Sequence, residues 1–250
     1  MFNYLTIAEI VRNKVDEGTA MTEHLGAWQL ILDGDAVLFA IVGLSLAVSL
    51  SAVALAAIAG MPLGALLALT LFPGRSILVV LLNALMGLPP VVVGLAVYLL
   101  LSRSGPLGSM GILFTPSAMV IAQTILILPI IAALTRQTVE DLWTEYRDEL
   151  TAMDVSPVGR ISTLLWDARY SLLTALLAGF GRAAAEVGAV MIVGGNIDGF
   201  TRTMTTAIAL ETSKGNLPLA MGLGLVLVAI VLAINAAAWG TRVWSERQAG

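Results

Sequence analysis

The sequence predicts an all-α integral membrane protein whose chain crosses the bilayer five times. Hydrophobic residues make up 58% of the 250 residues and charged residues only 12%, about half of the ~25% charged fraction that is usual in soluble domains. Five runs with few or no charges are long enough for a spanning helix, which needs about 20 apolar residues. The alternation of apolar and polar residues that is typical of a transmembrane barrel is absent from the sequence.

A polar segment, residues 1–35, precedes the membrane domain, which we place at residues 36–245. The segment has six acidic residues, two basic ones and no apolar core, so it does not resemble a signal peptide. Met21 is an alternative to Met1 as the native start. His24 is the only histidine and the chain has no cysteine, which excludes thiolate metal sites, histidine-clustered metal sites and Ser-His-Asp hydrolysis.

The first two predicted spans cover residues 36–71 and 76–102. We expect the first helix to kink at Met61-Pro62 and to continue beyond it. The second contains Gly87-Leu88-Pro89-Pro90, where the helix must bend because two prolines remove successive backbone donors. This break is either an ordinary kink or a gate.

The remaining spans are predicted at residues 117–137, 170–196 and 217–241. Residues 103–111 are rich in Gly, Pro and Ser and are predicted as a loop. Residues 197–215 are predicted as a second polar loop, between the fourth and fifth spans.

A charged stretch, residues 140–168, lies between the third and fourth spans. Its charges would be costly in lipid, so it must project into water. Residues 140–153 have helical composition, and Ser156 can cap a second helix whose first residue is Pro157. The expected helix-turn-helix knob suits a groove on a partner protein; the alternative is a solvated connection without a partner.

The basic residues predict the orientation of the five spans. With the N-terminus outside, seven basic residues fall on the inner side and five on the outer side, in the direction of the positive-inside rule. The inner residues are Arg75, Arg136, Arg147, Arg160, Arg169, Arg242 and Arg247. We therefore expect a multi-pass protein with an outer N-terminus, a cytoplasmic knob and a cytoplasmic C-terminus.

Two ionisable residues lie within the fourth span. Arg182 and Glu186 are four residues apart, so on one helix they share a face and can pair. The pair is either structural or part of a translocation path or subunit seam. Gly181, Ala185 and Ala189 recur every four residues and favour a close contact with another helix.

The sequence carries no G-x-x-x-x-G-K-[ST] phosphate-binding loop. Any use of ATP must therefore depend on another chain. Its scattered basic residues give no indication of nucleic-acid binding.

The knob resembles the coupling loop of ABC importer permeases, which reads roughly E-A-A-x-x-x-G followed by nine residues and I-x-L-P. The best register places Asp148 at the acidic position and Asp154 at the glycine, with Leu164 at the isoleucine and Trp166-Asp167 at Leu-Pro. Glu149 is an equally suitable acidic anchor. The resemblance implies that an ATPase subunit docks on Asp148, Glu149, Ala152, Asp154 and Ser156.

Two further segments are similar to tungstate- and molybdate-type permeases. One is Leu88-Pro-Pro-Val-Val-Val-Gly94-Leu, and the more specific one is the run from Gly179 to Gly215. Molybdate permeases carry G-E-F-G-A where this chain has A-E-V-G-A, which favours the tungstate type. The resemblance covers about residues 36–239. The residues that we expect at the path or gate are Pro89, Pro90, Arg182, Glu186, Gly194 and Asn196.

This resemblance implies a type I importer fold and a transport subunit that is not itself an enzyme. Its implied partners are a second copy of the chain, two ATP-binding cassette subunits, an extracytoplasmic oxyanion-binding protein and membrane lipid, with no cofactor bound directly. Tungstate is the expected substrate, and molybdate and sulfate are alternatives. A secondary transporter would leave the knob unexplained, and an intramembrane protease is disfavoured because the spans contain no paired aspartates.

Overall fold

The computed structural model describes residues 36–249, and this part of the chain contains helices and no strand. The predicted polar segment 1–35, with His24 and the alternative start Met21, lies outside the described residues. Three helices are long and apolar enough to cross a membrane: α3 (Ala36–Leu69), α6 (Pro116–Ala152) and α11 (Leu217–Ala249). The prediction of an all-helical, multi-pass membrane protein is confirmed.

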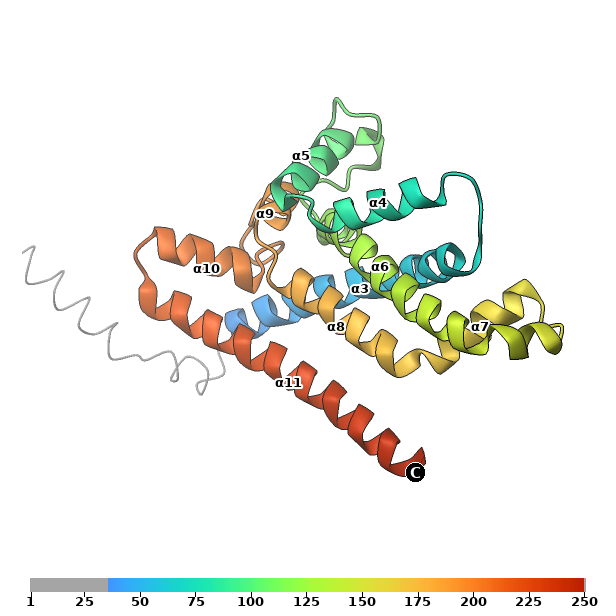
Figure 1. Ribbon diagram of the computed structural model, residues 1–250. Helices are drawn as coiled ribbons and strands as arrows, with labels where there is room; N and C mark the ends of the chain where they lie inside the picture. Colours follow the sequence, from blue (N-terminus) through green and yellow to red (C-terminus); the bar gives the residue numbers. More distant parts are fainter. Residues whose placement is uncertain (1–35, 250) are drawn as a thin grey trace, which may run out of the picture.

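Two further candidate spans are bent pairs of helices. The axes of α4 (Arg75–Met86) and α5 (Pro90–Leu101) meet at 101°, and those of α8 (Arg169–Ala184) and α9 (Gly188–Gly194) meet at 60°. The number of spans is three by helix length, or up to five if each bent pair is one span. Figure 1 shows α5 and α9 side by side, above the long helices.

The centre of the fold is the crossing of α3 and α6. Gly64 of α3 lies so close to α6 that a Cβ atom at this position would be 2.4 Å from the carbonyl oxygen of Ala132. Small residues permit such a backbone approach, which is a main source of helix association in lipid. Gly179 of α8 packs on the side chain of Ile127 of α6, so α6 contacts both α3 and α8.

The prolines within the long helices do not end them. Helix α3 continues through Pro62 to Leu69, and α6 continues through Pro129 to Ala152. We predicted the third span at residues 117–137 and a helix of the knob at residues 140–153, and in the structure both belong to the single helix α6. A helix of 37 residues is roughly 55 Å long at 1.5 Å per residue, much longer than the ~30 Å hydrocarbon layer.

The prediction of a polar loop at residues 197–215 is wrong. This segment contains helix α10 (Met204–Ser213), which begins in a capping box: Thr203 N–H donates to Thr206 Oγ1 at 3.0 Å, and the Thr203 side chain accepts from the backbone of Thr206. Ser45 of α3 reinforces this start, since its Oγ accepts from the Met204 N–H at 2.7 Å. The threonines that made the segment look like a loop are the cap of a helix.

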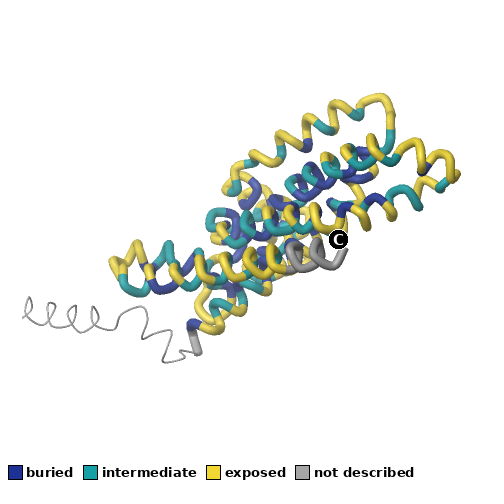
Figure 2. Tube along the Cα trace, turned by 60° about the horizontal axis from the view of Figure 1, so that its bottom comes forward, coloured by how far each residue is buried: buried dark blue, intermediate teal, exposed yellow. Residues whose placement is uncertain are grey.

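Exposed residues cover the outer faces of α4 and α11, whereas buried residues concentrate along α6 (Figure 2). Many of the exposed side chains are large and apolar, such as Ile77 on α4 and Leu232 on α11. In a membrane protein such faces contact lipid or other subunits.

Candidate functional site: the knob and two helix breaks

The knob, residues 140–168, is a helix-turn-helix. The last turns of α6 lead into a turn at residues 153–156, and α7 (Pro157–Asp167) follows. Gly159 N–H donates to Ser156 Oγ at 3.2 Å and Pro157 occupies the first helical position, so the predicted cap is confirmed. Asp154 has φ of 50°, a left-handed conformation that glycine adopts most readily. The coupling-loop register places Asp154 at the glycine of the family pattern.

The knob has its own small core, which attaches it to the end of α3. Val139, Leu150 and Leu164 are buried together with Ala65 and Ala68 of α3. Arg160 of α7 also ties the two arms, because its Nε donates to the carbonyl of Val155 at 2.8 Å and its guanidinium lies 5.5 Å from the ring centre of Trp143. The knob is therefore a packed element and not a loose loop.

The five residues expected to dock an ATPase all lie exposed on the knob: Asp148, Glu149, Ala152, Asp154 and Ser156. Large apolar side chains that the sequence reasoning did not single out lie beside them, namely Met153, Val158 and Trp166, the last with 71% of its surface exposed. Apolar residues of this size in a charged segment are a detectable indication of a contact surface.

A groove of about 310 Å³ separates the two arms of the knob. Its lining residues are Tyr146, Glu149, Leu150, Met153, Thr163, Leu164, Trp166 and Asp167. The negative charges of Glu145 and then Asp167, with smaller effects of burial and Glu149, raise the pKa of the Tyr146 phenol. The groove thus combines an apolar floor with an acidic rim, which suits a partner surface that presents cations beside apolar groups.

The first helix break joins α4 to α5. Gly87 ends α4, Pro89 is extended with φ of −64° and ψ of 123°, and Pro90 is the first residue of α5. A proline excludes the helical conformation from the residue before it and starts a new helix well. The bend of 101° at these residues confirms the predicted break.

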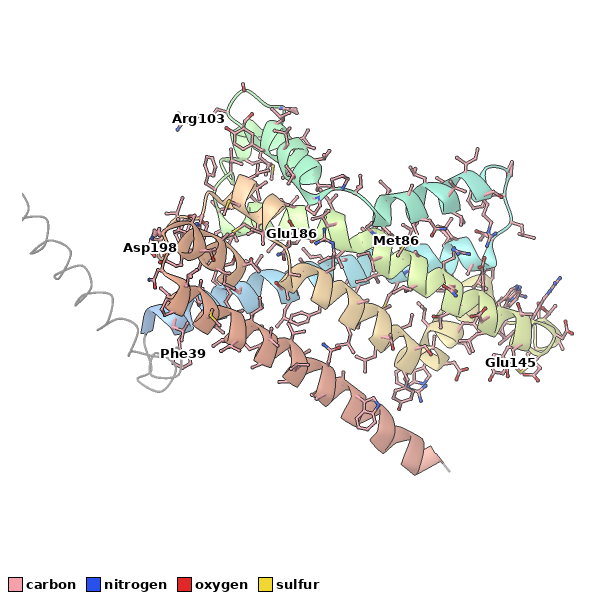
Figure 3. All side chains as sticks on the ribbon, turned by 60° about the vertical axis from the view of Figure 1, so that its left-hand side comes forward. Phe39, Met86, Arg103, Glu145, Glu186 and Asp198 are labelled. Carbon is pink, nitrogen blue, oxygen red and sulfur yellow. The ribbon has the colours of Figure 1, made fainter. Side chains whose placement is uncertain are left out.

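The second helix break lies at residues 185–187, between α8 and α9. Glu186 is at its centre and only 3% exposed (Figure 3). Its Oε2 accepts from Arg182 Nη1 at 2.5 Å, and its Oε1 accepts from the Ala189 N–H at 2.9 Å. Its backbone carbonyl accepts from Thr205 Oγ1 at 2.7 Å. One residue thereby joins the end of α8, the start of α9 and helix α10.

The predicted Arg182–Glu186 pair is confirmed, but the reason given for it is wrong. The two residues do not share a face of one helix, because α8 ends at Ala184 and Glu186 lies in the break. The predicted contact surface at Gly181, Ala185 and Ala189 is confirmed only at Ala189. A Cβ at Gly94 of α5 would be 2.7 Å from the Ala189 Cα, whereas a Cβ at Gly181 would meet no atom of another element within 4 Å.

The two breaks are adjacent in space. A Cβ at Gly188, which begins α9, would lie 2.9 Å from Val91 at the start of α5. The Oε1 atom of Glu186 lies 3.7 Å from the same position, so the start of α5, directly after Pro89 and Pro90, is brought near Glu186. Gly194 and Asn196 lie apart from them, at the other end of α9, where Gly194 packs on Met119 and Asn196 has φ of 49°.

The knob and the breaks are at different levels of the molecule. Figure 3 shows Glu145 of the knob at one end, Asp198 and Arg103 toward the opposite end, and Glu186 between them. Any effect of the knob on the breaks must therefore pass along helices. Residues 36–249 contain no group of three or more His, Cys, Asp or Glu that could hold a metal ion.

Comparisons with known proteins place this arrangement in a family, although no family model matches the chain. A probable anion ABC transporter permease protein of Haloferax volcanii is 45% identical over 204 residues, which cover 80% of this chain and 88% of the relative. The tungstate uptake system permease protein TupB of Peptoclostridium acidaminophilum is 40% identical over 210 residues, 84% of this chain and 92% of the relative.

A sulfate transport system permease protein CysW of Synechocystis is more distant, at 30% identity over 76% of this chain and 71% of the relative. All three relatives are permease proteins by name, and all three match over more than two thirds of their own length. The chain therefore belongs to the family of anion ABC transporter permease subunits.

Proposed function

We propose that this chain is the permease subunit of an ATP-driven importer that moves tungstate, or a related tetrahedral oxyanion, inward across the prokaryotic cytoplasmic membrane. The observation that carries the proposal is the 40% identity to a tungstate uptake permease over 92% of that protein's length. The packed knob and the two adjacent helix breaks of this chain further support the proposal, because they offer a docking surface and two bends in the membrane domain. Sulfate permeases are more distant, so sulfate is the weaker alternative substrate; molybdate is the other alternative, on the resemblance of the sequence to molybdate-type permeases.

The proposal includes five membrane spans and a fixed orientation of the chain in the membrane. Arg75 at the start of α4 forms an ion pair with Glu140 of the knob, which requires these two segments to lie on one side of the membrane. Phe114 N–H donates to the carbonyl of Val193 at 2.9 Å, which supports a common position for the segment before α6 and the end of α9 on the other side. The basic residues favour the cytoplasm for the knob.

The partners follow from the same proposal. Two copies of the chain surround the path, and an ATP-binding cassette subunit docks on each knob and hydrolyses ATP, since this chain has no phosphate-binding loop of its own. An extracytoplasmic binding protein selects the oxyanion. Pro89, Pro90, Arg182, Glu186, Gly194 and Asn196 line or control the path.

Reconstitution tests the proposal. Proteoliposomes with this chain, its ATPase subunit and the binding protein should take up tungstate only with ATP, and molybdate should compete better than sulfate. Uptake by the chain without an ATPase subunit would contradict the proposal and favour a secondary transporter.

Docking on the knob has its own test. Changing Asp148 and Glu149 together to lysine reverses the acidic rim and should abolish co-purification of the ATPase subunit, while the chain still inserts. The control is Asp198→Lys, which reverses an exposed carboxylate at the opposite end of the molecule, where it pairs with Arg202 and not with the knob. Normal co-purification of the double variant would refute the docking assignment.

Sidedness is tested with single cysteines, because the chain has none. Ser109→Cys in the 102–115 connection should react with a membrane-impermeant maleimide in intact cells. Ser162→Cys on α7 should react only after the cells are opened. The reverse pattern would refute the orientation.

A further inference from the structure

Helix α4 is held only weakly by side-chain packing. Leu82 is its single buried residue. An apolar groove of about 370 Å³ lies between α4, α3 and α6, lined by leucines of α3 and α4 and by Ile125, Leu128 and Pro129 of α6. The groove is open to the surface, so within this chain α4 packs on its neighbours mainly through Leu82, which is buried with Leu67 of α3 and with Ala132 and Ala133 of α6.

The start of α4 is instead fixed by polar contacts of Arg75. Its Nε donates to the Leu67 carbonyl at 2.7 Å, in the last turn of α3. Its Nη2 pairs with Glu140, at the base of the knob, and the Arg75 side chain is only 22% exposed. The second carboxylate oxygen of Glu140 pairs with Arg136, one turn earlier on α6.

The other end of α4 leads into the most tightly packed unit near the breaks. Three residues separate Met86 from the start of α5 at Pro90, and Gly94 of α5 lies against Ala189 of α9. A continuous series of rigid elements therefore runs from the knob through the Arg75–Glu140 pair, along α4, to the break at residues 87–89.

We propose that Arg75 is a positioning residue for coupling: through its pair with Glu140 it makes α4 follow the knob, so that displacement of the knob reaches the α5–α9 unit. The inference rests on the proposed function, because it assumes that an ATPase moves the knob. Few side chains of α4 are buried, so the helix can shift. The ion pair of Arg75 with Glu140 makes this shift depend on displacement of the knob. An arginine is suited to this role because it uses separate nitrogens for the carbonyl and the carboxylate.

The first experiment compares two neutral substitutions in the complete complex. Arg75→Gln removes the contact between helices, whereas Arg136→Gln removes a partner of the same Glu140 but leaves that contact in place. The measured quantity is tungstate uptake per ATP hydrolysed. We expect Arg75→Gln to lower this ratio at least about fivefold, the lower end of typical coupling between sites, and Arg136→Gln to keep it near the wild-type value. Arg75→Lys should restore part of the ratio.

A purely structural role of Arg75 would lower yield, uptake and ATP hydrolysis together and leave their ratio unchanged. A normal ratio in Arg75→Gln therefore overturns the inference. Absence of ATP-driven uptake by the wild-type complex would overturn the proposed function and the inference with it, so the two failures are distinguishable.

The second experiment replaces the ionic contact by a covalent one. Arg75→Cys with Glu140→Cys introduces two thiols into a chain that has no other cysteine. The double variant should be uncoupled like Arg75→Gln, and a short bis-maleimide that joins the thiols should restore the uptake ratio. Complete cross-linking without restored coupling would overturn the inference, and this readout remains valid if Arg75→Gln folds poorly.

Discussion

The two helix breaks differ in what makes them. The break between α4 and α5 is set by covalent structure, because Pro89 and Pro90 cannot continue a helix. The break between α8 and α9 contains no proline, and it is held open by one buried carboxylate, that of Glu186, which serves both neighbouring helices. The first is a property of the local chain, while the second depends on side-chain contacts and can be removed by one substitution.

The largest expected effect is that of Glu186→Ala. The change removes the partner of Arg182 and the acceptor for the Ala189 N–H, and breaking a buried ion pair by removing one partner typically costs about 3–5 kcal/mol. Since Arg182 keeps some exposure, we expect a loss near 3 kcal/mol. Thermal unfolding in detergent measures it.

Two further variants identify the part of this loss that is due to charge. Arg182→Ala with Glu186→Ala should recover much of the stability but not all of it, since the Ala189 N–H stays without its acceptor. Glu186→Gln can retain that acceptor and should be less harmful than Glu186→Ala. A double variant that is stable but slow in tungstate uptake would show that Arg182 acts in the path and not only in the structure.

A smaller effect is expected where the two breaks meet. Gly94→Ala places a methyl group 2.7 Å from the Ala189 Cα, so α5 and α9 must separate, at a cost of about 1–3 kcal/mol. Gly181→Ala is the control, because no atom of another element lies within 4 Å of its Cβ position and alanine favours a helix. Equal stability of the two variants would contradict the close packing of α5 on α9.

The smallest effect is expected for Pro89→Ala. The substitution increases the freedom of the unfolded chain, which costs about 0.4–1 kcal/mol. We expect the bend to persist, because Pro90 remains and still disfavours the helical conformation at the residue before it. The melting temperature should fall far less than in Glu186→Ala. A loss as large as that of Glu186→Ala would remove the distinction between the two breaks.

The same difference explains what could be predicted from the sequence. The first break and the cap at Ser156-Pro157 were predictable because proline and serine act within a few residues of the chain. The second break was missed because Ala183-Ala184-Ala185-Glu186 has high helix propensity, and the contacts that oppose the helix come from Ala189 and Thr205. Helix α10 was missed because threonines favour caps and loops alike. The exposed Trp166 was visible in the sequence but was interpreted only as part of the register.

The continuity of α6 also limits how the chain can change in evolution. The helix extends without interruption from Pro116 into the knob at Ala152, and each residue turns a helix by about 100°. Insertion of one residue between Pro129 and Arg136 would therefore rotate Glu140 away from Arg75 and turn the acidic rim of the knob to another direction. Insertions of about seven residues, close to two full turns, would preserve the phase but displace the knob by roughly 10 Å. We therefore expect homologues to keep the spacing of this segment fixed, while the 102–115 connection, which carries no such phase, can vary in length.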